Sequence, residues 1–211
     1  MLNDEVRTVE EAYTSATASS NLRCEADRRT DVDVLIAAGC TPGILGAALM
    51  RLRSELDGSE RLRPAVAADF VSAADSRKPV QTAAALWSAA QKMAHDHNTQ
   101  QAKLLMGKLN TMTRVVGILI EWADARALPD PHALAQAVVS FWLDGNCHSC
   151  HGRGSEVIPG TPSLGRKCKA CNGAGKRKEP GGEAGRLMLS LMEDSVTRAR
   201  TSMKKRLRKI S

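Results

Sequence analysis

The sequence predicts a mainly α-helical protein that carries a small cysteine-containing module near its C-terminal end. Aromatic residues make up 3% of the 211 residues, whereas the helix formers Ala, Leu, Met, Arg and Glu are frequent. Apolar residues recur in several segments at the three- and four-residue spacing of one helix face. Two Cys-x-x-Cys pairs interrupt this helical series once. We therefore expect a helical domain, an inserted module and a final helix.

The helical elements follow one another along residues 31–146, after a polar arm at residues 1–30. Residues 31–38 read as a short helix that Gly39 ends, and Thr41 and Pro42 are the expected N-cap and first-turn proline of a helix that runs to about Leu56. A short helix is expected near residues 64–74. Pro79 is the expected start of a longer helix, which the polar run at residues 95–100 interrupts.

Two further helices are expected before the cysteines, at residues 101–127 and 131–144, the second ending at Gly145. After the module, residues 180–182 (Pro-Gly-Gly) form a hinge to the last helix. That helix is amphipathic and basic, and we expect residues 179–211 to pack back on the helical domain. Its apolar stripe consists of Met188, Met192, Val196, Ala199, Met203 and Leu207.

Positive charge is concentrated in the last third of the chain. Residues 1–146 carry 15 Lys and Arg against 18 Asp and Glu, whereas residues 147–211 carry 15 against 5. A compact segment with a net charge of +10 most often faces a polyanion, and nucleic acid is the usual polyanion inside a cell. We therefore expect the two parts of the chain to have different partners.

The four cysteines of the two pairs predict a metal site. Cys147 and Cys150, and after 17 residues Cys168 and Cys171, each continue as Cys-x-x-Cys-x-Gly-x-Gly. Two residues between cysteines let both thiolates of one turn reach the same ion, and four thiolates close a tetrahedron. The glycines allow a sharp turn that points backbone N–H groups at sulfur. We expect one structural Zn²⁺ in a short β-hairpin or pair of knuckles at residues 147–178.

The cysteine pattern is compatible with three alternatives to a four-cysteine zinc site. His148 or His151 could replace a thiolate as a ligand. Cys147, Cys150 and His151 also spell the attachment motif of c-type haem, and either pair could be a redox pair. The second matching pair and the lack of an apolar export segment favour zinc over haem, and no βαβ pattern accompanies the pairs.

Basic residues surround the cysteines and recur in the final helix, where they are candidates for contacts with DNA phosphates. The alternative interpretation is a solvated rim that contacts nothing. The candidate DNA-binding residues are Arg153, Arg166, Lys167, Lys169, Lys176, Arg177 and Lys178 in the module, and Lys204, Lys205 and Arg208 in the final helix.

The order of these parts resembles the zinc-containing Q family, the late-gene antitermination proteins of lambda-like bacteriophages. The resemblance lies in a helix ending before Cys-x-x-Cys-His-Gly-x-Gly, the second Cys-x-x-Cys-x-Gly-x-Gly and the last amphipathic helix; residues 30–32, 37–39 and 46–48 add a fainter similarity. It implies a protein that binds a DNA element of the phage late promoter, engages bacterial RNA polymerase and lets it read through terminators. It also implies a helix-turn-helix, for which the helices at residues 101–127 and 131–144 are candidates.

A second resemblance is to the DnaJ-type chaperones, whose cysteine-rich region uses the same repeat. That region needs four repeats for two zinc ions and this chain has two, and the tripeptide His-Pro-Asp of the J-domain is absent. A DnaJ-like protein-binding zinc adaptor and an RNA-binding zinc protein remain the alternative functions.

The sequence gives no support for catalysis. Four cysteines leave no open coordination position for water or substrate, and no nucleophile elbow or phosphate-binding glycine loop is present. No window approaches the length of a membrane span. We therefore expect a non-enzymatic regulator in the cytoplasm of a bacterial host, with double-stranded DNA and RNA polymerase as partners and neither a membrane nor a small-molecule substrate.

Overall fold

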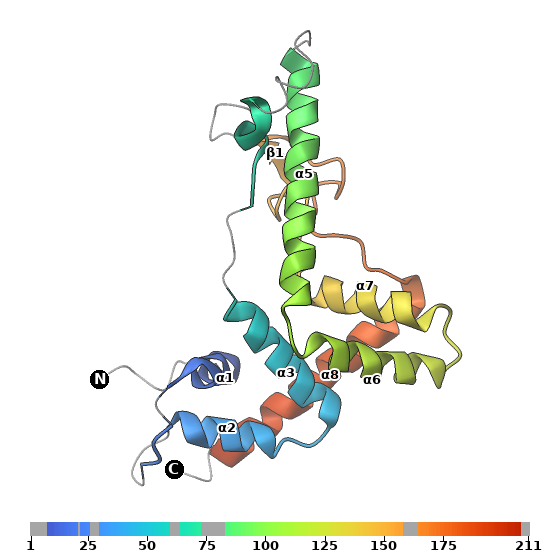
Figure 1. The fold of residues 1–211 in the computed structure, drawn as a ribbon. Helices are drawn as coiled ribbons and strands as arrows, with labels where there is room; N and C mark the ends of the chain where they lie inside the picture. The colour runs from blue at the N-terminus through green and yellow to red at the C-terminus, as the bar shows by residue number, and fades with distance from the viewer. Residues whose placement is uncertain are drawn as a thin grey trace. The chain divides into compact units, whose positions relative to one another are not determined.

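The computed structural model describes residues 8–20, 22–25, 30–59, 64–72, 83–157 and 164–207, and it confirms the mainly helical class. None of the helices in these ranges is both long and apolar enough to cross a membrane. The elements are α1 (Val9–Ala18), α2 (Asp31–Gly39), α3 (Ile44–Asp57), the 3-10 helix η1 (Ala67–Phe70), α5 (Ala83–Gly107), α6 (Met112–Asp124), α7 (Pro131–Leu143), β1 (Ser155–Val157), β2 (Leu164–Lys167) and α8 (Gly182–Leu207) (Figure 1).

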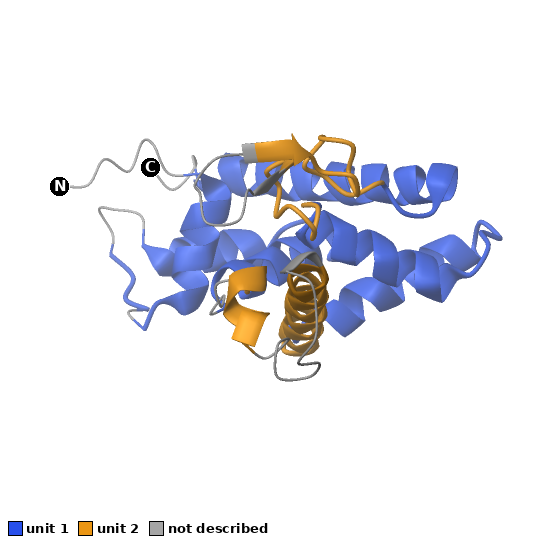
Figure 2. Cartoon of the chain, turned by 90° about the horizontal axis from the view of Figure 1, so that it is seen from above, with its two compact units in different colours: residues 1–59, 109–145, 179–211 blue, residues 60–108, 146–178 orange. Residues whose placement is uncertain are grey.

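The chain divides into two compact units, which Figure 2 distinguishes by colour. Unit 1 comprises residues 1–59, 109–145 and 179–211, and unit 2 comprises residues 60–108 and 146–178. This grouping differs from the contiguous domains that the sequence suggests, because residues 60–108 leave the helical unit and group with the cysteine module. The chain thus leaves unit 1 after α3, returns at α6, leaves again after α7 and returns at α8.

Helix α8 packs against α1, α2, α3 and α7 and is the central element of unit 1. Its side chains at Met188, Met192 and Met203 are fully buried. Helix α3 approaches it closely at Gly46, where a Cβ would collide with the backbone of Ser195. Glycine is therefore required at that crossing. The large apolar side chains that are fully buried in unit 1 are Leu49, Leu52, Val115, Leu119, Val138, Val139, Met188, Met192 and Met203.

The N-terminal region expected to be a polar arm contains a packed helix, α1. Thr8 and Glu11 close a capping box at its start, in which each side chain accepts from the other residue's backbone N–H. Val9 and Ala16 are buried against α8 and its neighbours. Glu10 forms an ion pair with Arg200 of α8. The helix is thus tied to unit 1 by both apolar and charged contacts.

The turn between α2 and α3 corrects the expected start of the second helix. Helix α3 begins at Ile44 with Gly43 as N-cap at φ +91°, so Thr41 and Pro42 precede it rather than open it. The hydroxyl of Thr41 instead donates to the Ala37 carbonyl, 3.2 Å away, at the end of α2. A Thr hydroxyl can accept from an N–H at the start of the next helix or donate to a carbonyl of the preceding one. The sequence around Thr41 is compatible with either hydrogen bond.

The helix expected at residues 101–127 is wrong in its extent, because α5 ends at Gly107 and α6 begins at Met112. A contact distant in sequence accompanies the break. The Glu55 carboxylate of α3 accepts hydrogen bonds from both the N–H and the hydroxyl of Thr111, immediately before α6. It also pairs with Arg51 at 3.4 Å. This buried threonine anchors the start of α6 to α3 within unit 1.

The interruption expected at residues 95–100 is also wrong, since α5 is continuous from Ala83 to Gly107. The polar run is compatible with a helix that presents it to solvent and to η1. The side-chain amide of Asn98 accepts a hydrogen bond from the Ala65 N–H at 2.8 Å and donates one to the Ala65 carbonyl at 2.9 Å. The His97 ring lies 5.7 Å from the ring of Phe70. The expected helix start at Pro79 lies outside the described residues.

Candidate metal centre

An antiparallel pair of short strands brings the two cysteine pairs close together. Cys147 and Cys150 lie in the turns that follow α7, and Cys168 and Cys171 follow β2 directly. Strands β1 and β2 pair with Ser155 opposite Lys167, and an isolated bridge joins Asn146 to Lys176 on the far side of the cysteines. The two ends of the module are therefore held together by backbone pairing.

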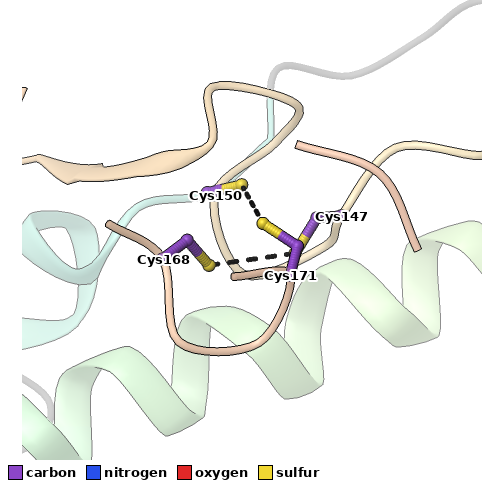
Figure 3. Close-up of side chains that lie close together, drawn as sticks. All are labelled: Cys147, Cys150, Cys168 and Cys171. Atoms are coloured by element: carbon purple, nitrogen blue, oxygen red, sulfur yellow. Dashed lines mark hydrogen bonds between the residues drawn. The ribbon is translucent and has the colours of Figure 1, made fainter. Parts of the chain in front are cut away.

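The four sulfur atoms converge, as Figure 3 shows. All four lie within 4.8 Å of one another; Cys147 Sγ is 4.0 Å from Cys168 Sγ, and Cys150 Sγ is 3.7 Å from Cys171 Sγ. These separations are about twice the bond length of a disulfide, so the cysteines are free thiols. A single metal ion fits between four sulfurs at this spacing. The predicted set of four ligands is thus brought together by the structure.

The backbone around the cysteines repeats one pattern twice and links the two halves. The Cys147 N–H donates to the Gly175 carbonyl and the Cys168 N–H donates to the Gly154 carbonyl, both at 2.8 Å. Within each half, the second glycine donates its N–H to sulfur at 3.2 Å, Gly154 to Cys150 and Gly175 to Cys171. Each knuckle therefore completes backbone hydrogen bonds of the other, and the sulfurs of Cys150 and Cys171 receive N–H contacts that favour thiolates.

Glycine is required at Gly154 and Gly175 for two reasons. Both residues have positive φ, +74° and +71°, which side-chain-bearing residues adopt only at a cost. A Cβ at Gly154 would also collide with the Gly173 carbonyl, and one at Gly175 with the Gly152 carbonyl. The glycines of the repeated motif thus allow the two knuckles to approach each other at the backbone.

The electrostatics of the cluster favour a cation. Burial raises the pKa of the Cys150 thiol to about 11, an effect larger than that of the Gly154 N–H. Burial also opposes ionisation of Cys171, but hydrogen bonds to its sulfur from Gly175, Cys150 and others lower its pKa to about 7. Without a cation the cluster therefore keeps protons on some sulfurs. A bound dication would stabilise all four thiolates.

The described part of the module has no aliphatic core of its own. Its buried cluster consists of Cys147, Cys150 and Cys168, with Cys171 packed partly buried against them. The four cysteine side chains bury little apolar area compared with the leucines and methionines of unit 1. A fold of this size with so little apolar burial needs a metal or another cross-link for stability.

The geometry also bears on the alternative uses of these cysteines. His148 and His151 are exposed, and the metal-compatible cluster in the described residues contains cysteines alone. In a redox pair the two sulfurs of one Cys-x-x-Cys usually sit at the start of a helix. Here each pair lies in a turn with no helix directly after it, and each sulfur has its close contact in the other pair.

The candidate DNA-binding residues fall into two groups. Those of the module are in unit 2: Arg177 is partly buried, and the other six, Arg153, Arg166, Lys167, Lys169, Lys176 and Lys178, are exposed. Arg153 donates through Nε to the Cys150 carbonyl at 3.2 Å, and this bond orients its guanidinium on the knuckle. Lys204 and Lys205 are exposed on the last turn of α8 in unit 1, and Arg208 lies outside the described residues.

Sequence reasoning missed the backbone contacts that join the two halves of the module. These are the Asn146–Lys176 bridge and the hydrogen bonds that the N–H groups of Cys147 and Cys168 donate to the other half. The Gly-x-Gly repetition was the available signal for the reciprocal bonds, whereas nothing local in the sequence marks the bridge.

Comparisons with protein-family models, with curated proteins and with solved structures found no match for this chain. Its class is therefore defined by the structure itself, as a mainly helical protein with a buried four-cysteine cluster able to hold a metal ion.

Proposed function

We propose that Cys147, Cys150, Cys168 and Cys171 bind one structural Zn²⁺. With Zn–S bonds of about 2.3 Å, a regular tetrahedron places its sulfurs about 3.8 Å apart. The separations of 4.0 and 3.7 Å across the two pairs agree with this spacing. Four-sulfur tetrahedral sites select Zn²⁺ or iron–sulfur chemistry, and paired knuckles on one closed site are typical of zinc.

We further propose that the module binds the phosphate backbone of nucleic acid, with duplex DNA as its target. Residues 147–178 carry seven Lys and Arg against one Glu, a net side-chain charge of +6. Zinc with four thiolates contributes −2, so the loaded module keeps an excess of about four positive charges. The single observation that carries this proposal is that six of these seven cations are exposed around a backbone held by reciprocal hydrogen bonds.

The most specific function supported is that of a phage-type antitermination factor. In this proposal the protein binds an element of a late promoter and bacterial RNA polymerase, and the polymerase then reads through terminators. The DNA-binding part is supported by charge and by the cysteine geometry. The polymerase part is supported by the resemblance in the order of elements around the two knuckles, with α6 and α7 corresponding to the helices named as helix-turn-helix candidates.

Selection of bound sequences from a random duplex library by the zinc-loaded protein tests the DNA proposal. Enrichment of a defined site is expected, with affinity that falls with salt at a log–log slope near −5 if about six phosphates are neutralised. Transcription through a terminator, on a template carrying the selected site, then tests antitermination. Salt-sensitive binding without enrichment, or preference for single-stranded RNA, would favour an RNA-binding zinc protein; no nucleic-acid binding would favour a protein-binding adaptor.

A further inference from the structure

A cavity of about 570 Å³ opens in unit 1 at the turn between α2 and α3, and the proposed function makes no use of it. Its size is that of a ligand or side-chain binding site. Ile44, at its edge, exposes 64% of its surface. The apolar lining includes Leu35, Ala38, Ile44, Ala47, Met50 and Met203. We call this surface the α2–α3 groove.

The floor of the groove suits an apolar helix face. Met50 and Met203 are buried, and methionine side chains adapt their shape to the group that packs against them. Ala38 and Ala47 are small, so the two helices leave room for side chains from outside. Grooves of this kind receive amphipathic helices through apolar residues spaced three and four apart.

The polar rim of the groove is cationic. Arg51 lines it with a side chain 64% exposed, and Arg114 of α6 lines it and is exposed. Arg114 has no ion pair among the described residues, and Arg51 shares its partner Glu55 with Thr111. Two guanidinium groups therefore line the groove. The one carboxylate paired with them, that of Glu55, also accepts hydrogen bonds from Thr111. A ligand with carboxylates beside apolar residues would be complementary to this arrangement.

We propose that the α2–α3 groove binds an acidic amphipathic helix of a partner protein, with its carboxylates beside Arg51 and Arg114. The apolar face of that helix would contact Leu35, Ile44 and Ala47, beneath which Met50 and Met203 are buried. A protein helix fits better than nucleic acid, because a phosphate backbone would leave the apolar floor uncovered. This inference does not depend on the DNA-binding proposal, because the groove lies in unit 1 and the cysteine module in unit 2.

The test uses the full-length zinc-loaded protein and two fluorescent peptides of about four helical turns. Both carry leucines three and four residues apart; one has glutamates at the remaining positions and the other has lysines. Fluorescence anisotropy should show saturable binding of the glutamate peptide and at least about tenfold weaker binding of the lysine peptide. Equal affinity for both peptides, or no saturation with either, would overturn the proposal.

Matched variants locate the binding site. Arg114→Glu should weaken the glutamate peptide about tenfold, whereas Arg126→Glu, just past the other end of α6 and outside the groove, should change it less than about twofold. Ile44→Glu should weaken it similarly, and Ile36→Glu, exposed on α2 but not lining the groove, should not. Equal losses within either pair, or displacement of the peptide by duplex DNA, would contradict the assignment.

Discussion

The helical unit and the cysteine module of this chain are stabilised in different ways. Unit 1 buries leucine, valine and methionine side chains around α8, each contributing about 1.5 to 3 kcal/mol of apolar burial. The described module buries little besides its own sulfurs. In our proposal its order therefore depends on a metal ion bound by the four cysteines and on the reciprocal backbone hydrogen bonds, which would hold only while the sulfurs converge.

Unit 1 and the cysteine module should therefore respond to different perturbations. Loss of metal should unfold the module and leave α3 and α8 packed, since the buried cluster around α8 and the buried cysteine cluster are built from different residues. Overpacking of unit 1 should destabilise unit 1 and leave the cysteine module folded. Charge follows the same division, because the module carries a net side-chain charge of +6 whereas unit 1 carries 16 Lys and Arg against 18 Asp and Glu.

The largest expected effect is that of Cys150→Ser. The substitution removes one of four ligands from a buried site, and structural zinc contributes on the order of 10 kcal/mol to small modules. We expect loss of stoichiometric zinc by elemental analysis, and loss of ordered amide signals of the module. Cys40→Ser, at an exposed cysteine outside the cluster, is the control and should keep one zinc. Stoichiometric zinc and an unchanged melting curve in Cys150→Ser would contradict the assignment.

A second substitution attacks unit 1 alone. Gly46→Val would drive a side chain into the backbone of Ser195 at the crossing of α3 and α8 and should lower the free energy of unfolding by about 3 kcal/mol. Gly117→Ala, in α6 with open space around its Cα, should raise it by up to about 1 kcal/mol. Denaturant unfolding measures both. Zinc content should stay at one per chain; a Gly46→Val protein as stable as the parent would refute the crossing.

The third prediction concerns charge. Replacing Lys176, Arg177 and Lys178 by glutamate should weaken DNA binding about a hundredfold at physiological salt, equally for all sequences, and reduce the salt slope by about three. Lys92, Lys103 and Lys108 in the other part of unit 2 are exposed and allow the same change in charge. That control triple variant should bind nearly as the parent does. Similar losses in both variants would mean that net charge alone, and not the module, is recognised.

The smallest effect is expected for Gly154→Ala. A methyl group at φ +74° costs about 1 to 2 kcal/mol and meets the Gly173 carbonyl, so zinc affinity should fall about tenfold. Competition with a chromophoric chelator measures this affinity. Ala174→Ser, exposed in the other knuckle, should leave it unchanged. Equal affinities for the parent and Gly154→Ala would show that the knuckles do not need their close approach.

The helical class and the four-cysteine set were predictable because each has a local signal. Residues 31–38 match α2 within one residue, since apolar periodicity and a glycine stop both act over a single turn. The two knuckles were recognisable because ligand spacing within one turn decides whether two thiolates can reach one ion. No tertiary contact had to be known for either prediction.

The remainder depends on contacts between residues distant in sequence. The gap between α5 and α6 coincides with the Thr111–Glu55 contact, which spans 56 residues of sequence. The continuous stretch of α5 coincides with the Asn98–Ala65 contact, which spans 33 residues. The grouping of residues 60–108 apart from unit 1 has no local marker either. Gly46 reads as an ordinary helix residue until α8 is packed against it.

Amide hydrogen exchange on the full-length protein, before and after removal of metal by a chelator, tests the central claim most directly. The account predicts that protection is lost in residues 146–178, is kept in α3, α6, α7 and α8, and returns when zinc is added back. Loss of protection across unit 1 as well, or unchanged protection in the module, would contradict it.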